Sequence, residues 1–511
     1  MEKLNIMIGG AAGQGINKVS EIVSNVLVGQ GYFTFNYRDY PSLIRGGHNF
    51  NVLSISDEPI SSHESKIDIL VALDEKTTEI HKTSLKEDAI TITAEEFKDE
   101  RKNLNIALAG SLIKILGVPF ENIEKELKSQ FNESDLPVKS AKKGYESKKE
   151  KFKLTKLTNK ISILSGSEAI AIGARNSNLD LYIAYPMTPA TNAMNELAEN
   201  QIEDNLMVFQ AENEIAAASM AIGASFTGAK TLVGTSGGGF DLMSETLSLQ
   251  GICEIPLTVY LATRPGPGTG VPTYTAQSDL DIALRAGHGE APRVVIAPGN
   301  PVETVENTSE ALFLSEKFGT LSIILSDKHL AESEFSSTKN PKEKDKFEIT
   351  RPVPGKTIIK ASSYETDDYG NSTELAELTG KNADRRIEKY LKIKKLIEEK
   401  MEMIKIHGNE NSKNLIIGWG STSGAIIDAI KGLDAKFLQV IYMKPLSNKI
   451  KEEMLKAKTL ILVECNVTGQ LGRLIREKTG IKIPNRILKY DGRPFHSDEL
   501  KKYLGELINN K

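Results

Sequence analysis

Short apolar runs alternate with amphipathic stretches along most of the chain, which is the pattern of α/β domains. We expect buried strands near the N-terminus at residues 4–8 and 67–73, in a parallel sheet. A second series of central strands is predicted, with helical patterns between them, at residues 181–185, 206–209, 231–234 and 256–261. A third group opens with a strand that runs through glycines into a helix at 415–424, followed by a strand at 460–464.

Charged segments separate these groups. Residues 134–160 are rich in lysine and serine, which indicates a linker or surface extension. A later charged stretch contains apolar residues at helical spacing, which predict one long connecting helix through Tyr390, Ile393, Ile397, Met401 and Ile404. The sequence therefore predicts an α/β domain at residues 1–151 and a second α/β domain at 152–335. A charged linker with the long helix follows at 336–411, and a final α/β domain at 412–511.

Composition narrows the function. The 511 residues are 40% hydrophobic, enough for about three globular domains. A net charge of -4, from 64 basic and 68 acidic side chains, argues against nucleic acid as a partner. Cys253 and Cys465 are the only cysteines, so this chain cannot supply the four thiolates of an iron–sulfur cluster. No apolar run reaches the roughly 18 residues of a membrane span, and we expect a cytoplasmic protein with no membrane attachment.

Two glycine-containing segments lie in the first domain. Gly9 to Gly15 follows a strand and opens a helix, but Asn36 and Tyr37 stand where a dinucleotide site would need an acidic residue. The turn, including Gly13 and Gly15, is therefore either a tight structural turn or an anion site. Tyr40 to Asn49 places Arg45 beside Gly46 and Gly47, which favours a loop that contacts a ligand or subunit over a solvated surface loop.

Most candidate functional residues lie in the second domain. The first of these segments, Tyr185 to Pro189, follows a buried strand. Pro186 and Pro189 restrict the backbone, so the Thr188 hydroxyl is presented rigidly at the carboxyl end of the strand. A plain proline turn is the alternative.

Glu212 and Glu214 leave the next strand and enter an alanine-rich helix that ends near Gly228. Residues two apart on a helix face different ways, so these carboxylates cannot share one role. Glu214 lies on a stripe with Ala217, Ala218 and Ala221, whose small side chains permit a close partner, and it could hold or donate a proton. Glu212 is assigned to the first helical turn, where it complements the helix dipole, and dipole complementation is the alternative for Glu214 as well.

Two flexible loops follow further strands of this domain, at Thr235 to Gly239 and Arg264 to Gln277. With the segments at Thr188 and Glu214, four loops would meet at one carboxyl edge of a parallel sheet, which is where α/β proteins bind ligands.

These motifs, in combination and order, resemble the 2-oxoacid:ferredoxin oxidoreductases in the arrangement that fuses a γ domain ahead of the α subunit. The resemblance covers nearly the whole chain and adds the motifs Ser326-Asp327, Asn466 to Leu471 and Tyr490 to Pro494. It implies a γ-type α/β domain, a pyrimidine-type thiamine-diphosphate-binding α/β domain and a transketolase C-terminal-like α/β domain.

The resemblance also implies roles for individual residues. Glu214 matches the glutamate that protonates N1′ of the cofactor's aminopyrimidine, with Pro186, Ser236 and Gly237 as further cofactor-binding residues. Substrate binding falls to Thr188, Tyr185, Arg264, Thr269 and Tyr274. Many relatives carry a basic residue where Tyr274 stands, which leaves the substrate open. Coenzyme A binding or interface contact is implied for Gly13, Gly15, Arg45, Gly46 and Gly47.

A partner chain is expected because an Asp-Gly strand end that would hold diphosphate and magnesium occurs only at Asp491-Gly492, which Arg-Pro follows rather than a helix. No metal ligands are assigned to this chain. The resemblance gives Mg²⁺, the diphosphate and a 4Fe-4S cluster to a β subunit, in an assembly of two α and two β subunits. The implied reaction is the coenzyme A-dependent oxidative decarboxylation of a 2-oxoacid, with ferredoxin as electron acceptor. Because the γ/α fusion resembles the 2-oxoglutarate-type branch, we expect 2-oxoglutarate-type or broad specificity, with pyruvate as the other candidate substrate.

Two other functions would account for part of this pattern. A transketolase-like thiamine enzyme without ferredoxin would share the fold and the glutamate but would normally carry both halves of the cofactor site. A non-catalytic nucleotide- or acyl-CoA-binding module built on the first glycine turn would leave Glu214 and Thr188 unexplained.

Overall fold

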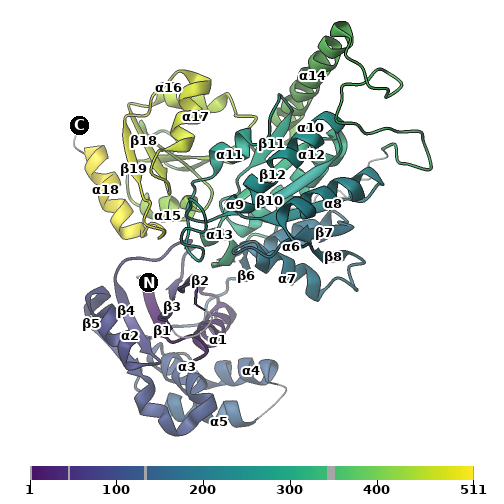
Figure 1. The fold of residues 1–511 in the computed structure, drawn as a ribbon. Helices are drawn as coiled ribbons and strands as arrows, with labels where there is room; N and C mark the ends of the chain where they lie inside the picture. The colour runs from purple at the N-terminus through teal and green to yellow at the C-terminus, as the bar shows by residue number, and fades with distance from the viewer. Residues whose placement is uncertain (1–2, 44–46, 132–134, 342–350, 510–511) are drawn as a thin grey trace. The chain divides into compact units, whose positions relative to one another are not determined.

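The structure is a computed structural model that describes residues 3–43, 47–131, 135–341 and 351–509 (Figure 1). The chain forms two compact units. The first unit comprises Met1–Leu164, Ser333–Asn340 and Phe495–Lys502. The second unit comprises Ser165–Glu332, Pro341–Pro494 and Tyr503–Lys511.

The first unit contains a seven-stranded sheet. Its strands, in spatial order, are β5 (Leu85–Thr93), β4 (Ile67–Ala72), β1 (Leu4–Gly10), β3 (Asn49–Ser56), β2 (Phe33–Asp39), β13 (Glu334–Ser337) and β6 (Ser162–Ser165). Helices, 3-10 turns included, connect the strands: α1 (Ile16–Gly29), α2 (Glu75–His81), η1 (Lys82–Ser84), η2 (Ala94–Asn103), α3 (Leu104–Ile115), α4 (Phe120–Gln130) and α5 (Asp135–Glu146).

This sheet is mixed, so the prediction of a parallel sheet is wrong for part of it. β1, β4 and β5 run parallel, whereas β3 is antiparallel to both β1 and β2. Residues 40–48, which join β2 to β3, are too few for a crossover helix, and a short connection returns the chain antiparallel to the strand it leaves.

The predicted linker at residues 134–160 is partly a packed helix. α5 lies so close to α3 that a Cβ on Gly110 would come within 2.0 Å of the carbonyl oxygen of Ala141, and one on Gly144 within 1.9 Å of that of Ala107. Small residues at both contact points let the two backbones touch. Lys139, Lys142 and Lys143 are exposed on α5, and the other lysines of the segment follow the helix.

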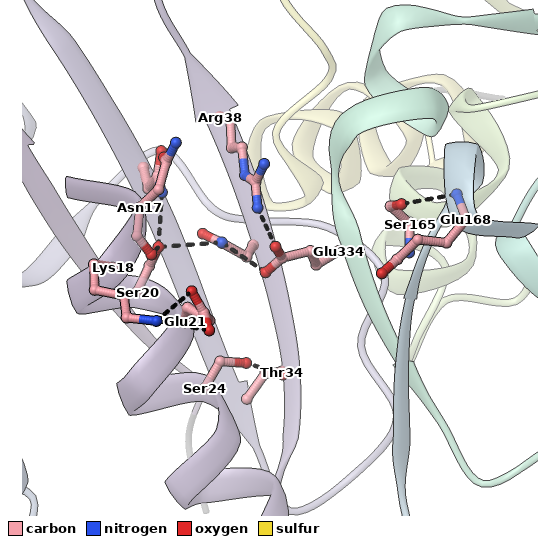
Figure 2. A network of polar contacts seen from close by, with 12 residues as sticks. Asn17, Lys18, Ser20, Glu21, Ser24, Thr34, Arg38, Ser165, Glu168 and Glu334 are labelled. Carbon is pink, nitrogen blue, oxygen red and sulfur yellow. Dashed lines mark hydrogen bonds and ion pairs between the residues drawn. The ribbon is translucent and has the colours of Figure 1, made fainter. Parts of the chain in front are cut away.

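A strand from late in the sequence completes the first sheet. β13 pairs antiparallel with β2, and Glu334 accepts hydrogen bonds from Arg38 and, at 2.9 Å, from Asn36 Nδ2. Figure 2 shows Arg38 and Glu334 pointing toward each other, with Asn17 and Ser20 of α1 in the same network. The first unit is therefore not contiguous in sequence.

The second unit contains two sheets. The larger has seven strands, in the order β17 (Tyr442–Lys444), β11 (Arg293–Ile296), β12 (Leu321–Asp327), β10 (Leu257–Thr263), β9 (Thr231–Thr235), β7 (Leu181–Ala184) and β8 (Met207–Gln210). All neighbours from β11 to β8 are parallel, as predicted, and only β17 is antiparallel. The associated helices are α6 (Gly166–Asn176), α7 (Thr191–Glu199), α8 (Glu214–Phe226), α9 (Gly237–Leu242), α10 (Ser244–Cys253), α11 (Leu280–Arg285), α12 (Pro301–Phe318) and α13 (Lys328–Glu332).

The strand predicted at 206–209 exists, but it is not central. β8 lies at the edge of the sheet, with Met207 60% and Phe209 44% exposed. An apolar run is equally typical of a core strand and of a strand that meets another protein, so the sequence pattern does not separate the two.

The second sheet has five strands, in the order β14 (Ile404–Gly408), β16 (Lys436–Val440), β15 (Asn414–Trp419), β18 (Thr459–Glu464) and β19 (Asn485–Leu488). Its helices are α15 (Thr422–Ala429), α16 (Lys449–Lys456), α17 (Gln470–Thr479) and α18 (Ser497–Asn509), the last of which spans both units. The predicted strands at 415–418 and 460–464 are confirmed as β15 and β18.

The predicted long helix is α14 (Ala376–Lys400). It buries Ile393 and Ile397 as expected, but it ends at Lys400, and Ile404 begins β14. Ile404 continues the helical spacing of apolar residues beyond the end of α14, although it belongs to a strand.

Candidate functional site

The carboxyl ends of four adjacent parallel strands bring the predicted residues to one edge of the larger sheet. Thr188 follows β7, Glu214 follows β8, Ser236 follows β9 and Arg264 follows β10. The convergence predicted from the sequence is therefore present, and it lies within the second unit.

The end of β7 is tied to the end of β10. Arg264 Nη1 donates a hydrogen bond of 2.9 Å to the carbonyl oxygen of Thr188. Thr188 is half-buried, and Tyr185 is 40% exposed. The Thr188 backbone is thus held in place, while its hydroxyl makes no hydrogen bond to the residues that the structure describes.

Helix α8 runs from Glu214 to Phe226. Asn213 is the N-cap, and its Oδ1 accepts a hydrogen bond of 2.8 Å from the Ala216 amide. Glu212 precedes the cap and is exposed, so its assignment to the first helical turn is wrong. The side-chain oxygen of Asn213 satisfies one of the free N–H groups at the helix start, and Glu214 is the acidic residue of the first turn.

Glu214 itself is only 4% exposed, and the small-residue stripe of Ala217, Ala218 and Ala221 is fully buried, as predicted. Oε1 of Glu214 is buried and makes no hydrogen bond within the described residues. Oγ of Ser236 is also buried and makes no hydrogen bond within the described residues. Unsatisfied polar atoms are costly in a protein interior, so two of them beside one strand edge indicate a ligand that supplies their partners.

Glycines of α9 make room for these groups. A Cβ on Gly239 would lie 2.6 Å from Glu214 Cγ and 2.8 Å from Oε1. A Cβ on Gly237 would lie 2.3 Å from Oδ2 of Asp279. The glycine run predicted as a flexible turn is instead a short helix start that lets carboxyl side chains approach its backbone.

Asp279 was not predicted as a site residue. Burial raises its pKa to about 6 and nearby Asp241 adds to that rise, while a hydrogen bond from Ser278 and the charge of Arg264 act in the opposite direction. Burial also lowers the pKa of Arg264, against the effect of the carboxyl groups of Asp279 and Glu214. The sequence signal for Asp279 was its position directly before α11, because Asp is a common residue at a helix start.

The long loop from Arg264 to Gln277 has an exposed tip and a fixed end. Gly266 to Gly270, including Thr269, are exposed. Gln277 is fully buried, its Nε2 donates to the Trp419 carbonyl at 2.8 Å, and its Oε1 accepts from the Cys465 amide at 2.9 Å. The motif at Asn466 belongs to this anchor, since Asn466 Nδ2 donates to the Gln277 carbonyl at 3.1 Å.

Tyr274 sits on the fixed part of the same loop. The guanidinium carbon of Arg493 lies 3.6 Å from the centre of its ring, and the Thr275 amide donates to the Gly492 carbonyl at 3.1 Å. The motif from Tyr490 to Pro494 therefore places a cation against Tyr274.

The N-terminal glycine segments lie in the first unit. Gly13 and Gly15 have positive φ angles, 89° and 88°, and Gly15 is the N-cap of α1. Arg45 and Gly46 fall outside the described residues, whereas Gly47 lines a cavity of about 730 Å³ together with Ala11, Leu73, Asp74 and Lys76. The turn and the loop thus meet at one cavity.

The two cysteines are packed thiols. Cys465 is buried and Cys253 is half-buried, and burial raises the pKa of both. Neither has the depressed pKa of a nucleophilic cysteine. Across the described ranges, no helix combines the length and apolarity of a bilayer span.

Comparison with known proteins decides the family. Residues 172–402 match the family described as pyruvate flavodoxin/ferredoxin oxidoreductase, thiamine diP-bdg, and residues 5–134 match pyruvate ferredoxin/flavodoxin oxidoreductase. The alpha subunit of the 2-oxoacid:ferredoxin oxidoreductase of Saccharolobus solfataricus is 30% identical, over 99% of this chain and 98% of that one. The chain belongs to this family.

As a 2-oxoacid:ferredoxin oxidoreductase alpha-type subunit, the chain is part of a multi-subunit oxidoreductase. Thr188, Glu214 and Arg264 lie in residues 172–402, which match the thiamine-diphosphate-binding family. The 2-oxoglutarate synthase subunit KorA of Archaeoglobus fulgidus is 28% identical, over 62% of this chain and 90% of that one. A solved 2-oxoglutarate:ferredoxin oxidoreductase from Magnetococcus marinus shares the fold, with a TM-score of 0.91, 24% identity and full coverage of both chains. The predicted family and fold class are confirmed.

Proposed function

We propose that this chain is the α subunit, with a fused γ-type region at residues 1–151, of an enzyme that oxidatively decarboxylates a 2-oxoacid. The carbon–carbon bond to the carboxylate breaks to release CO2, coenzyme A receives the acyl group as a thioester, and ferredoxin takes the electron pair. The regions at 152–335 and 412–511 correspond to the pyrimidine-type and transketolase C-terminal-like domains, joined by the linker at 336–411.

One observation carries the proposal. The buried Oε1 of Glu214 is unpaired within the described residues and lies against Gly239, at the strand edge that also presents Thr188 and Arg264. A carboxyl group in that setting fits a ring nitrogen that needs a proton donor. The donor set therefore fits the aminopyrimidine of thiamine diphosphate, with Ser236, Gly237 and Pro186 as its further contacts.

Glu214 would hold a proton at Oε1 and share it with the ring nitrogen. Its burial keeps water from competing for that proton, and Gly239 leaves the space that the side chain occupies. When bound, the cofactor supplies the carbon nucleophile for the substrate carbonyl.

The substrate would lie beside Thr188 and Arg264. The Thr188 hydroxyl donates to the 2-oxoacid, and the guanidinium pairs with a carboxylate while the Thr188 carbonyl holds one of its nitrogens in place. Tyr185 and the exposed Thr269 would complete the contacts as the loop tip approaches.

We favour 2-oxoglutarate over pyruvate. Its second carboxylate needs a second cation, and the guanidinium of Arg493 lies against Tyr274 on the loop that carries Arg264. The similarity to KorA of Archaeoglobus fulgidus, named a 2-oxoglutarate synthase subunit, supports the same choice.

Coenzyme A is the proposed acyl acceptor, and the solved relative from Magnetococcus marinus is described with coenzyme A and succinyl-CoA bound. Gly13, Gly15 and Gly47, with Arg45 and Gly46, are proposed to contact it or to form an interface.

A β subunit is proposed to complete the site. Met207, Phe209, Ile215 and Met220 leave 39% to 60% of their side chains exposed on β8 and α8, next to Glu214. An apolar edge strand of this kind is typical of a surface that another protein covers. The Asp491-Gly492 pair does not offer this chain a metal site, because Asp491 is exposed and paired with Lys489 at 2.8 Å. The partner would therefore hold Mg²⁺ and the diphosphate, together with a 4Fe-4S cluster. The proposed assembly is cytoplasmic and contains two α and two β subunits.

The test is to co-purify the chain with its β subunit and to assay it with ferredoxin, coenzyme A and either 2-oxoglutarate or pyruvate. The proposal predicts a brown complex whose turnover requires added thiamine diphosphate, with 2-oxoglutarate preferred. A colourless complex that is active without ferredoxin would support the transketolase-like alternative.

A further inference from the structure

A second candidate site lies in the second unit, away from the strand edge that carries Glu214. It is a cavity of about 390 Å³ between α11, α14, α16, α17 and the segment that follows β17. β17 runs antiparallel to β11, so the chain leaves Lys444 toward the amino end of the parallel strands. Thr188 and Glu214 lie at their carboxyl ends.

The lining of this cavity is strongly basic. Five cations face a single carboxylate, Glu477, and they are Arg285, Lys394, Lys444, Lys451 and Lys478. Glu477 is already paired with Arg285 at 2.5 Å and with Lys478 at 3.0 Å. The carboxylate therefore neutralises only part of the positive charge.

Lys444 and Lys451 are the lining lysines that have no ion-pair partner among the described residues, although the charge of Glu477 acts on Lys444. Within the described ranges neither amine makes a hydrogen bond or an ion pair. Burial lowers the pKa of Lys444 to about 8, and the positive charges of Arg293, Lys478 and Arg285 add to that effect. Cations held together in this way are stabilised when an anion binds between them.

The chemistry of the donors selects the kind of anion. Arg285, whose planar group would suit a carboxylate, is already occupied by Asp281 at 3.1 Å and by Glu477. The amines that remain are compact point charges, which suit a phosphate group.

The rest of the wall combines apolar side chains with the polar Ser447, Asn448 and Thr479. Tyr390 is half-buried and lines the cavity with Leu284, Met443 and Leu474. A cavity of this size with a basic end and an aromatic wall accommodates a ring attached to phosphate groups.

We propose that this cavity is a binding site for a nucleoside phosphate, with Lys444 and Lys451 on the phosphates and Tyr390 against the base. Because it lies at the opposite edge from Glu214 and Thr188, the ligand is an effector rather than a substrate. The inference does not depend on the proposed function.

Calorimetry on the full chain with ATP, AMP and inorganic phosphate tests the proposal. We expect saturable binding with affinity in the order ATP, AMP, phosphate. Lys444→Gln/Lys451→Gln should weaken ATP binding at least about tenfold, because each lost contact is charge-assisted. The matched control is Lys102→Gln/Lys125→Gln, two exposed lysines of the first unit, which should bind ATP as the natural chain does.

A second variant tests the base contact independently of the charges. Tyr390→Leu should weaken ATP binding several-fold and leave phosphate binding unchanged. Equal ATP affinity in the lysine double variant and the natural chain would overturn the proposal and place any nucleotide elsewhere, such as the cavity of the first unit. Absence of ATP binding at millimolar concentration would also overturn it, as would tighter binding of a polyglutamate peptide than of ATP.

Discussion

Gly239 lies so close to Glu214 that an added Cβ would come within 2.6 Å of its Cγ and 2.3 Å of Thr235 Oγ1. The glutamate is therefore held by the backbone of α9 as well as by its own helix. A side chain at position 239 would have to displace it.

Gly239→Ala should destabilise the protein by about 1–3 kcal/mol and lower turnover of the reconstituted complex, because it overpacks the Glu214 pocket. Gly238→Ala is the matched control, since nothing lies within 4 Å of its added Cβ. That control should be neutral or stabilising by up to about 1 kcal/mol, as expected for alanine in a helix. Chemical denaturation and steady-state assays measure both, and equal effects of the two substitutions would contradict the packing described for Glu214.

Thr188→Val should raise KM for the 2-oxoacid about fivefold, the equivalent of one hydrogen bond worth about 1 kcal/mol, and leave thiamine diphosphate occupancy unchanged. The backbone carbonyl that binds Arg264 remains in this variant, so the arginine keeps its position. Loss of cofactor with an unchanged KM would instead place Thr188 in the cofactor pocket.

The purified chain alone, given Mg²⁺ and thiamine diphosphate, should neither bind the cofactor tightly nor turn over. It presents the Glu214 side of the site, while the partner is proposed to hold the charged end. Isothermal titration calorimetry checks this, and stoichiometric tight binding without the partner would refute it.

Asp279→Asn should stabilise the protein at neutral pH and have little effect near pH 4. Burial raises the pKa of Asp279 to about 6, whereas an unfolded aspartate titrates near about 3.9, so the folded state holds the proton more tightly. The natural chain therefore loses stability as the pH rises through this window, and the asparagine variant does not. The difference should grow to on the order of 1–2 kcal/mol by pH 7 in urea denaturation. A difference that is constant from pH 4 to pH 7 would show that Asp279 titrates normally.

Much of the second unit could be predicted from its sequence. The strands at residues 181–184, 231–235 and 257–263 are apolar on both faces because helices cover both sides, and such runs identify parallel strands well. Their carboxyl ends must share an edge, so the convergence of Thr188, Glu214 and Arg264 followed from topology alone.

Other features depend on long-range contacts that local patterns do not encode. β13 joins the first sheet from a position far along the chain, and β8 is an edge strand although its composition resembles that of the core. The packing of α5 on α3 depends on Gly110 and Gly144, and no local pattern identifies these glycines as a contact between helices. Asp279 gains its raised pKa from burial that only the folded chain provides.

Glu212 lies two residues from Glu214 and provides an internal control for the proposed role of Glu214 as the catalytic acid. Glu214 is buried with an unpaired oxygen among the described residues, while Glu212 is exposed before the helix cap. Glu214→Gln keeps the size and hydrogen-bonding capacity of the side chain but cannot deliver an acidic proton. Glu212→Gln removes only an exposed charge.

The most direct measurement is the turnover of the reconstituted complex carrying Glu214→Gln or Glu212→Gln, with saturating thiamine diphosphate. We predict that Glu214→Gln leaves the complex assembled and lowers kcat roughly 10²- to 10⁴-fold, the usual contribution of a general acid. Glu212→Gln should leave kcat nearly unchanged. Equal losses in the two variants, or a larger loss for Glu212→Gln, would contradict the assignment of Glu214 as the catalytic acid.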